Sequence, residues 1–442
     1  MARRAAKLPS GRISEVFAED KERQGAYDLL ESGRVDPAVL AGTLGEVTAH
    51  RSAQEPFVFV AVDGSSVNLG DQSSCKNFGS VGSLRQGARG LKVISALAVN
   101  PEGVPLGLFT QVWWSRMHAR RQTAMQRRRR NHKRKVEDKE TRYWLEAIEQ
   151  TTACARAANA KLWFQLDREA DNRDVLFKLA QTGQQFTVRS SWDRVVEATG
   201  NDRQHLRQWL SQKAPRGRYL LPISAGPNRM ARSARMVVRW ACVVLRLRTG
   251  QSHQTRPLRV TAVWAREQGT CPRGEKPVDW LLLTSVSVRS LQGAQAVVTG
   301  YARRWRVEEM HKTWKTGACN VEQTQLRSSQ AVKVWATLLA AVAVRIERLK
   351  FLSRNAPEQP ASTELTSHEI RALILLKRQA KKRTEVIPDT IPSIGQATVW
   401  IAELGGYTGK SSGGPPGSIT IRRGLERLQP AAALLKALES EP

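Results

Sequence analysis

Cysteine is scarce in this chain: its 442 residues include five, an odd number spread far apart along the sequence. None of them forms a C-x-x-C pair, so the pattern indicates neither a zinc site nor a disulfide framework. The N-terminus lacks the apolar core of a signal peptide, and the apolar run Val332–Val344 is too short to span a membrane. We therefore expect a protein of the reducing cytosol without a membrane segment, in which Val332–Val344 forms a core helix.

Acidic residues are outnumbered: 40 Asp and Glu stand against 70 Lys and Arg, which gives a formal net charge of +30. This excess favours a polyanionic partner, DNA or RNA, because cationic side chains neutralise phosphates and release counterions. The hydrophobic content of 41% is sufficient for buried cores, unlike that of a purely basic tail. The densest basic run is Arg120–Lys135. A solvated loop or a nuclear-localisation segment is the alternative, and we interpret it as a loop that lies on phosphates.

Apolar periodicity orders the elements in the middle of the chain. It predicts strands at 56–64, 91–99 and 106–114, a helix at 141–158, a strand at 161–166, a helix at 174–181 and a strand at 186–190. A meander of three strands followed by alternating helices and strands is the order of an α/β fold of the RNase H-like, retroviral-integrase-like type. In that fold the first and fourth strands are neighbours.

Other segments flank or interrupt this core. Alternating residues at 235–248 and 257–265 predict a β-rich insertion at about 190–275, before a strand at 279–285. Helical patterns dominate both ends of the chain. We therefore expect three parts: a helical region at 1–50, a core at 51–328 and a helical region at 329–442.

The segment Tyr301–Lys315, YARRWRVEEMHKTWK, places charges where an amphipathic helix would have apolar residues. At about 100° per residue, five polar side chains fall within an arc of roughly 80°: Tyr301, Arg304, Glu308, Lys312 and Lys315. Carboxylates bind hard divalent metals, whereas Arg, Lys and Tyr bind phosphate. A solvated face with i,i+4 ion pairs is the alternative. The flanking Trp305 and Trp314 favour a metal-dependent site that acts on a polynucleotide backbone.

Two further acids follow apolar strands. The run Pro56–Leu69 delivers Asp63 to the C-terminal end of a predicted buried strand, before a Gly-Ser-Ser turn. The segment LWFQLDREAD delivers a second group of acids in the same way, and ligand sites in α/β sheets lie at such strand ends. Asp167, Glu169 and Asp171 share one strand parity, so their spacing leaves the choice among them open.

The order Tyr, two residues, Arg, three residues, Glu, six residues, Lys resembles the Tyr-Arg-Glu-Lys signature of the insertion-sequence-four family of bacterial DDE transposases. The match continues through Arg304–Ala318, and LWFQLDREAD resembles a second segment of that family. The resemblance selects Asp167 as the acid between Asp63 and Glu308. It implies that Asp63 bridges two divalent metal ions and that Asp167 and Glu308 each complete one. Ligation by carboxylates suits Mg²⁺, with Mn²⁺ as a substitute.

The activity implied by the resemblance is cut-and-paste DNA transposition. Water would nick one strand at a transposon end, the freed 3′-hydroxyl would form a hairpin with the opposite strand, and water would reopen it before target joining. The partners implied are the terminal inverted repeats, the target duplex and a second copy in a homodimer, at the nucleoid in the bacterial cytoplasm. The residues implied to contact DNA are Arg189, Trp280, which would stack a flipped base, Tyr301, Arg304, Lys312 and Lys315.

Three alternatives remain open at this point. The N-terminal GAYDLL resembles the family's DNA-recognition region, but this chain starts later than family members do, as expected for an inhibitor that dimerises with an active copy. A basic packaging protein without catalysis also fits the charge, and it would lack metal-dependent cleavage. For Trp280, packing at the start of a buried strand is the alternative to base stacking.

Overall fold

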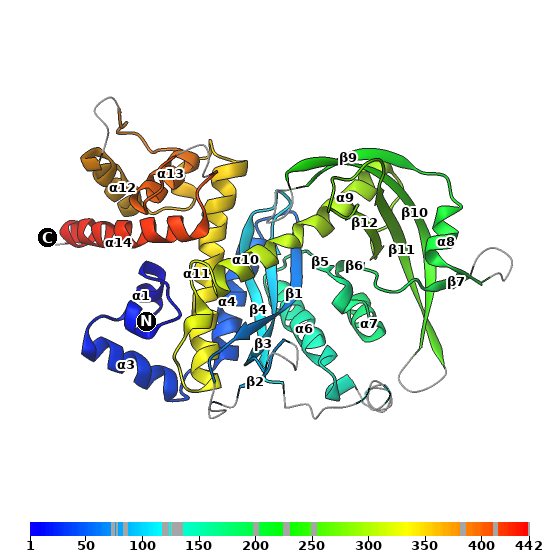
Figure 1. The fold of residues 1–442 in the computed structure, drawn as a ribbon, viewed down its shortest axis with the longest axis horizontal. Coiled ribbons are helices and arrows are strands. Elements are labelled where there is room, and N and C mark those ends of the chain that lie inside the picture. Colours follow the sequence, from blue (N-terminus) through cyan, green and yellow to red (C-terminus); the bar gives the residue numbers. More distant parts are fainter. Residues whose placement is uncertain are drawn as a thin grey trace.

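One large sheet runs through the molecule, with helices on both faces and a group of helices at one end (Figure 1). The computed structural model describes residues 1–71, 76, 78–82, 87–116, 123, 125, 136–197, 203–223, 230–248, 254–380, 386–409 and 414–440. The predicted basic loop Arg120–Lys135 lies outside the described residues, apart from Thr123 and Met125.

The sheet has ten strands and is mixed. Its hydrogen-bonded order is β2-β3-β1-β5-β6-β12-β11-β10-β9, and β4 pairs with β3. The pairs β1–β5 and β5–β6 are parallel, whereas the remaining pairs are antiparallel. The strands of this sheet are β1 (Val58–Asn68), β2 (Gly79–Ser80), β3 (Arg89–Val99), β4 (Pro105–Trp114), β5 (Leu162–Leu166), β6 (Gln185–Arg189), β9 (Gly217–Ile223), β10 (Arg232–Arg248), β11 (Thr255–Glu267) and β12 (Asp279–Thr284).

The helices follow the predicted order in the centre and account for both ends of the chain. The α-helices are α1 (Ala2–Lys7), α2 (Ile13–Val16), α3 (Asp20–Glu31), α4 (Pro37–Ser52), α6 (Thr141–Ala157), α7 (Arg173–Gln181), α8 (Leu206–Ser211), α9 (Leu291–Arg303), α10 (Trp305–Lys315), α11 (Ser329–Asn355), α12 (Ser367–Ala380), α13 (Ile394–Leu404) and α14 (Ser418–Ser440). Short 3₁₀ turns are η1 (Val136–Asp138), η2 (Arg168–Ala170), η3 (Val321–Gln323) and η4 (Ala361–Thr363). A two-stranded sheet joins β7 (Val195–Glu197) to β8 (Arg203–His205).

The prediction that the first strand lies beside the strand at 161–166 is confirmed, since Val62 in β1 is in register with Leu166 in β5. The predicted end of the first strand is wrong. β1 continues to Asn68 because it pairs with β3 along its whole length, and no Gly-Ser-Ser turn interrupts it. Asp63 therefore lies in the middle of β1, at the point where the shorter β5 ends.

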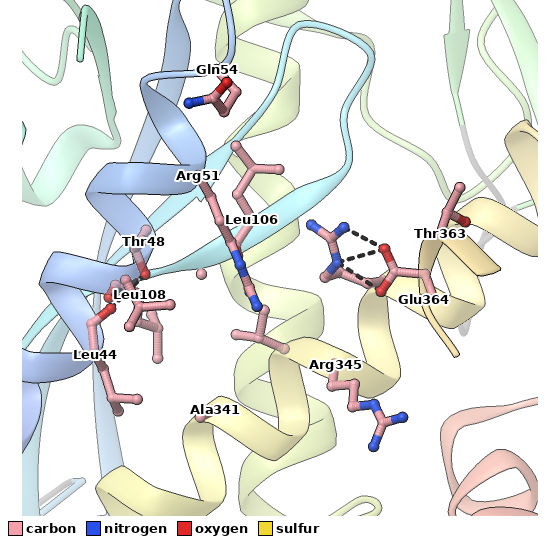
Figure 2. Close-up of a pocket in the computed structure, with 14 residues that line it drawn as sticks. Leu44, Thr48, Arg51, Gln54, Leu106, Leu108, Ala341, Arg345, Thr363 and Glu364 are labelled. Atoms are coloured by element: carbon pink, nitrogen blue, oxygen red, sulfur yellow. Dashed lines mark hydrogen bonds and ion pairs between the residues drawn. The ribbon is translucent and has the colours of Figure 1, made fainter. Parts of the chain in front are cut away.

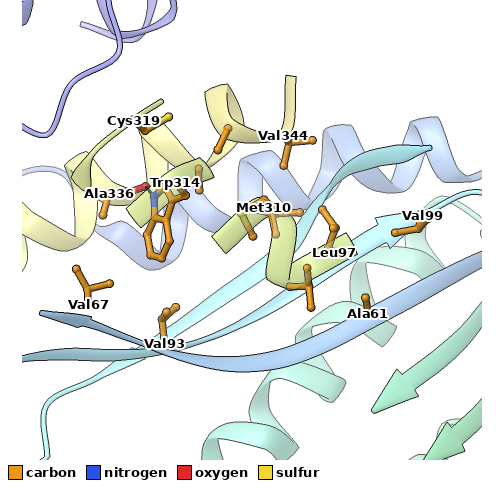
Figure 3. Close-up of a cluster of buried hydrophobic side chains, with 14 of the residues drawn as sticks. Ala61, Val67, Val93, Leu97, Val99, Met310, Trp314, Cys319, Ala336 and Val344 are labelled. Atoms are coloured by element: carbon orange, nitrogen blue, oxygen red, sulfur yellow. Dashed lines mark hydrogen bonds between the residues drawn. The ribbon is translucent and has the colours of Figure 1, made fainter. Parts of the chain in front are cut away.

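Strand parity decides which face of the sheet carries the acids. Along β1, the residues Val58, Val60 and Val62 belong to the core beneath α6 and α7. Phe59 and Ala61 belong to the other core, formed with α9, α10 and α11 (Figure 3). Because successive side chains alternate between faces, the odd-numbered Asp63 projects toward α9 and α10. The same alternation along β5 directs Asp167 to that face.

The predicted β-rich segment between β6 and β12 does contain long strands. β11 pairs along its full length with the Met236–Arg248 part of β10, and β9 pairs with the other end of β10. These strands are not a separate sheet: β11 pairs with β12, and β12 pairs with β6, so the main sheet continues into them. β9, β10 and β11 form one end of the molecule, opposite the helices α12, α13 and α14 (Figure 1).

The helix α11 corrects the predicted length of the apolar helix at Val332–Val344. It spans 27 residues and is long and apolar enough to cross a membrane by length and composition alone. Most of its apolar window is buried inside the protein, where it contacts α1, α3, α4, α10, α13, α14 and β4. Its burial against seven elements is that of a core helix, as predicted.

Candidate active site

Three carboxylates from distant parts of the chain surround one guanidinium group. Asp63 comes from β1, Asp167 directly follows β5, and Glu308 lies in the first turn of α10. The Arg304 guanidinium contacts all three: Nη1 lies 3.6 Å from Asp63 Oδ1, and Nη2 lies 3.8 Å from Asp167 Oδ2 and 2.6 Å from Glu308 Oε1. The fold therefore brings the three predicted acids together around a buried arginine.

Arg304 reaches this position because the predicted single helix is broken there. Arg304 separates α9 from α10. The turn is tightened by two hydrogen bonds that span three residues, from Arg304 N to Tyr301 O and from Val307 N to Arg304 O. At Gly300 the backbone approaches the sheet so closely that an added Cβ would lie 2.6 Å from the Phe59 ring. The break and the close approach together place Tyr301 and Arg304 beside the middle of β1 and the end of β5, where the acids lie.

The second helix of the pair is anchored below the acids. Met310 and Trp314 of α10 are fully buried, and the Trp314 indole donates a hydrogen bond to the Ala336 carbonyl of α11 at 2.8 Å (Figure 3). The other flanking tryptophan, Trp305, is exposed. Of the two tryptophans that argued against a solvated face, therefore, only Trp314 is buried.

The acids have different electrostatic environments. Burial, together with neighbouring carboxylates, raises the pKa of Asp63 to about 7, although Arg304 opposes this shift. Burial also raises the pKa of Glu308. Asp167 is buried as well, but Arg304, a backbone N–H, Tyr301 and Arg189 hold its pKa below its usual value. Arg304 and the more distant Arg189 lower the pKa of Asp167 but do not offset the effect of burial on Asp63 and Glu308, whose pKa values stay raised.

Two predicted DNA-contact residues, Tyr301 and Arg189, adjoin Asp167, and a third, Trp280, packs on Tyr301. The Tyr301 hydroxyl donates a hydrogen bond to Asp167 Oδ1 at 2.9 Å, and Arg189 Nη1 lies 3.8 Å from the same oxygen. Burial raises the pKa of Tyr301 to about 12, so it remains a hydroxyl donor at neutral pH. The half-buried Trp280 packs edge-to-face on Tyr301, with ring centroids 5.1 Å apart. Arg189, Trp280 and Tyr301 therefore form one wall of the acid cluster.

The two lysines lie farther along α10. Lys315 pairs with Glu322, with Nζ 3.5 Å from Oε1, and Lys312 is exposed. Among the described residues, no ion pair joins either lysine to Asp63, Asp167 or Glu308. The predicted arc of five side chains therefore divides into Tyr301, Arg304 and Glu308 at the acid cluster and two lysines away from it, of which only Lys312 is exposed.

His311 is a member of the site that the sequence argument missed. It is buried, its Nε2 lies 3.0 Å from Ser95 Oγ, and its Nδ1 lies 4.0 Å from Asp63 Oδ2. Burial, with help from Lys315 and Arg304, lowers its pKa to about 3, so the ring is neutral at pH 7. The available signal was its spacing of three residues from Glu308, which places both side chains on one helix face.

The choice among Asp167, Glu169 and Asp171 can now be made on structural grounds. Asp171 is buried away from the cluster, in an ion pair with Arg194 at 2.6 Å. Glu169 is near enough to raise the pKa of Asp63, but only Asp167 contacts Arg304 directly. The geometry therefore favours Asp167 as the acid of this segment that belongs to the cluster.

The donor chemistry of the cluster suits a hard divalent cation, because all three acids offer only oxygen ligands and carry excess negative charge. The present spacing does not close a metal site. Within the described part of the chain, no group of three or more His, Cys, Asp or Glu side chains lies close enough to hold a metal ion. The Arg304 guanidinium lies among the three carboxylates, at the position where a metal ion would otherwise supply positive charge.

A cavity of about 570 Å³ opens elsewhere in the molecule, between α4, β4 and α11 (Figure 2). Arg51, Arg345 and Arg348 border it, and Arg348 is paired with Glu364. None of the nine predicted site residues lines this cavity. The candidate active site is therefore the acid cluster at the sheet surface, which is separate from the cavity.

A family model described as the transposase DDE domain matches residues 110–345, more than half of the chain. The matched span begins in β4 and ends in α11, so it includes all of the candidate site apart from the first acid, Asp63, and its neighbour Ser95. Asp63 lies outside the matched span, but it belongs to the same cluster because Arg304 contacts Asp63 as well as Asp167 and Glu308.

Proposed function

This chain belongs to the transposase DDE domain family, and on that premise we propose that it cuts and joins DNA by metal-dependent, cut-and-paste transposition. The observation that carries the proposal is the meeting of Asp63, Asp167 and Glu308 around the Arg304 guanidinium. A packaging protein has no need for three partly buried acids that repel its own polyanionic partner. Divalent cations bound by the acids would offset this repulsion.

Asp63, Asp167 and Glu308 are the residues that would hold divalent ions, with Asp63 shared between two. Bound there, two such ions would stabilise negative charge on the attacking and leaving oxygens of a phosphodiester. Oxygen-only ligation favours Mg²⁺, with Mn²⁺ as a substitute. Arg304 keeps the carboxylates together before an ion arrives, because it offsets part of their repulsion. His311 lies between Ser95 and Asp63 and, as a neutral ring, adds no further charge.

The cations near the acids would bind the phosphates that flank the scissile bond. Two nitrogens of Arg304, Nε and Nη1, are buried and have no hydrogen-bond acceptor among the described residues. Buried donors of this kind are costly unless an acceptor arrives, and a phosphate oxygen would satisfy them. Arg189 and Tyr301 adjoin the same point. Lys312 and Lys315, farther along α10, would follow the strand away from the cut.

Trp280 fits a role in the hairpin step. It is half-buried, with one edge packed against Tyr301, so part of its ring is fixed and part is accessible. A flipped base stacked on it would relieve crowding as the 3′-hydroxyl crosses to the opposite strand. This feature, with the Tyr301–Arg304–Glu308–Lys315 pattern, supports membership of the insertion-sequence-four group within the family.

The arrangement of strands supports an RNase H-like core for this activity. The meander β1-β3-β4, the parallel neighbours β5 and β6, and the acids at adjacent strands β1 and β5 are the features on which this assignment rests. For the helices at 329–442 we propose contacts with a second copy of the chain and with DNA at the nucleoid of a bacterial cell.

The test is cleavage of DNA that carries the inverted repeats flanking the gene. The purified chain should nick the repeat end in Mg²⁺ and not in EDTA. Asp63→Asn, Asp167→Asn and Glu308→Gln should each abolish nicking, and Asp174→Asn is a control because its carboxylate lies outside the cluster, beside Arg173. All four variants should still bind the duplex in EDTA. Retained nicking in one of the three acid variants would remove that residue from the site.

A further inference from the structure

The loop that follows β6 presents a tryptophan to solvent beside the acid cluster. Trp192 is 65% exposed, although it lies only three residues after Arg189, which adjoins Asp167. Tryptophan has the largest apolar surface of any residue, so exposure of most of it in the free protein forgoes substantial burial energy. The conformation of the loop does not result from the packing of this side chain.

A buried carboxylate fixes the loop instead. The Asp171 side chain is fully buried and accepts hydrogen bonds from Ser190 Oγ at 3.1 Å, Ser191 N at 2.7 Å and Trp192 N at 3.3 Å. Both of its oxygens also accept from Arg194, at 2.6 and 2.8 Å. One acid therefore holds the backbone N–H groups of Ser191 and Trp192 and the side chains of Ser190 and Arg194, and in this loop conformation the Trp192 indole is exposed.

The same loop is joined to the site on two sides. The Ser191 hydroxyl donates to the carbonyl of Arg168, the residue after Asp167, at 2.7 Å. Ser190 N donates to the Leu281 carbonyl, next to Trp280, also at 2.7 Å. Hydrogen bonds thus connect the loop that carries Trp192 to the acid-bearing turn and to the strand that carries Trp280.

The neighbours of Trp192 in the loop are polar: Ser190, Ser191, Asp193 and Arg194. A protein partner would need a contiguous apolar patch, which these residues do not provide. An isolated flat ring beside cationic side chains suits a single nucleobase, because every base has a face that stacks on an aromatic side chain. We propose that Trp192 is a stacking platform for an unpaired base of the DNA strand that reaches the acid cluster, a contact additional to that of Trp280.

This inference rests on the proposed function, but its test requires no catalysis. The probe is a fluorescein-labelled single strand of twelve thymidines, and its binding is measured by anisotropy in EDTA. Trp192→Ala should weaken binding about 5- to 150-fold, the range for loss of one stacked base. Trp192→Phe should retain most of the affinity, whereas Trp192→Leu, which is apolar but has no π-face, should behave like the alanine variant. Leu220→Ala, at a residue of similar exposure on β9, is the control and should bind as the wild type does.

Salt dependence distinguishes stacking from charge. Because no phosphate contact is lost, plots of log affinity against log salt should be parallel for wild type and Trp192→Ala. A second readout is a 2-aminopurine placed within the strand, whose fluorescence should be quenched by wild type and Trp192→Phe and not by Trp192→Ala.

Equal affinities for wild type and the alanine variant, or equal losses in the phenylalanine and alanine variants, would overturn the proposal. So would retention of affinity by Trp192→Leu, which would indicate a simple apolar contact. Thermal unfolding curves that coincide with wild type exclude misfolding as the cause of a loss. If the acid variants still cleave DNA while stacking holds, the proposed active site fails and this inference stands. If the acid variants lose cleavage as proposed while all Trp192 variants bind normally, the proposed active site stands and the stacking role of Trp192 fails.

Discussion

Replacing Asp63 by Asn should make the metal-free protein more stable at neutral and alkaline pH, although the same change should abolish catalysis. Burial and the nearby carboxylates raise the pKa of Asp63 from its usual 3.8 to about 7. Between these values the folded protein holds a proton that the unfolded chain has released. The free energy of unfolding therefore falls as pH rises through this window. Asparagine does not ionise and avoids this loss.

The size of the effect follows from the pKa difference. Each unit corresponds to about 1.4 kcal/mol, so a difference of roughly three units gives an upper bound of about 4 kcal/mol above pH 7. The lost attraction between Asp63 and Arg304 acts in the opposite direction and is already contained in the raised pKa. We expect the asparagine variant to exceed wild type by about 1–4 kcal/mol at pH 8.

In wild type, the titration of His311 opposes that of Asp63, so the effect of Asp63 is seen only by comparing wild type with Asp63→Asn. The pKa of His311 is lowered from 6.5 to about 3, so the unfolded chain binds a proton in that range that the folded protein does not. Its contribution to the free energy of unfolding therefore rises with pH from about 3 to 6.5, opposite to that of Asp63. Wild type should show little slope between pH 4 and 6.5, whereas Asp63→Asn should gain stability with pH across the same range.

Urea denaturation in EDTA at pH values from 4.5 to 8.5 measures both proteins. The difference in free energy of unfolding should grow with pH up to about 7 and then stay constant. Asp279→Asn is a control for which the free energy of unfolding should change in the opposite direction. Asp279 is partly buried, but Trp264 and Arg207 hold its pKa below its usual value. The Asp279→Asn variant should therefore lose stability at neutral pH. A difference between Asp63→Asn and wild type that does not change with pH, or a variant less stable than wild type at pH 8, would refute the reasoning.

Two further predictions concern DNA. Trp280→Ala should spare the first nick and slow hairpin formation about 5- to 150-fold, the rate equivalent of one lost stacking contact. Denaturing gels of end-labelled DNA measure both steps. Equal losses in the two steps would assign Trp280 to core packing. Log affinity for duplex DNA should fall by about 0.9 per neutralised phosphate for each unit of log salt. Neutralising Arg127–Arg130, which lies outside the described residues, should flatten that slope, and an unchanged slope would make this run a solvated loop.

Much of the central fold was predictable because its strands are continuous apolar runs. The segments that became β1, β5 and β6 are buried on both faces, and such segments leave an unambiguous pattern. The adjacency of Asp63 and Asp167 followed from strand order. The end of β1 did not, because it depends on pairing with β3, a long-range contact with no local signature.

The details of the site were less accessible to sequence reasoning. The helical arc correctly grouped Tyr301, Arg304 and Glu308, but periodicity assumes an unbroken helix and could not reveal the turn at Arg304. It also placed Lys312 with the acids, whereas this side chain is exposed. The role of Asp171 depends on five hydrogen bonds to a loop 19 to 23 residues later. That loop gave no apolar or charge pattern by which Trp192 would have been noticed.

The central claim is that the carboxylates of the cluster bind the metal that cleaves DNA, and a change of metal preference tests it most directly. Asp167→Cys replaces a hard oxygen ligand by a softer sulfur, which binds Mg²⁺ poorly and accepts Mn²⁺ more readily. We expect this variant to nick transposon-end DNA in Mn²⁺ and not in Mg²⁺, while wild type is active in both and Asp167→Ala in neither. A cysteine variant with the same ratio of Mg²⁺ to Mn²⁺ activity as wild type would show that Asp167 does not ligate the metal.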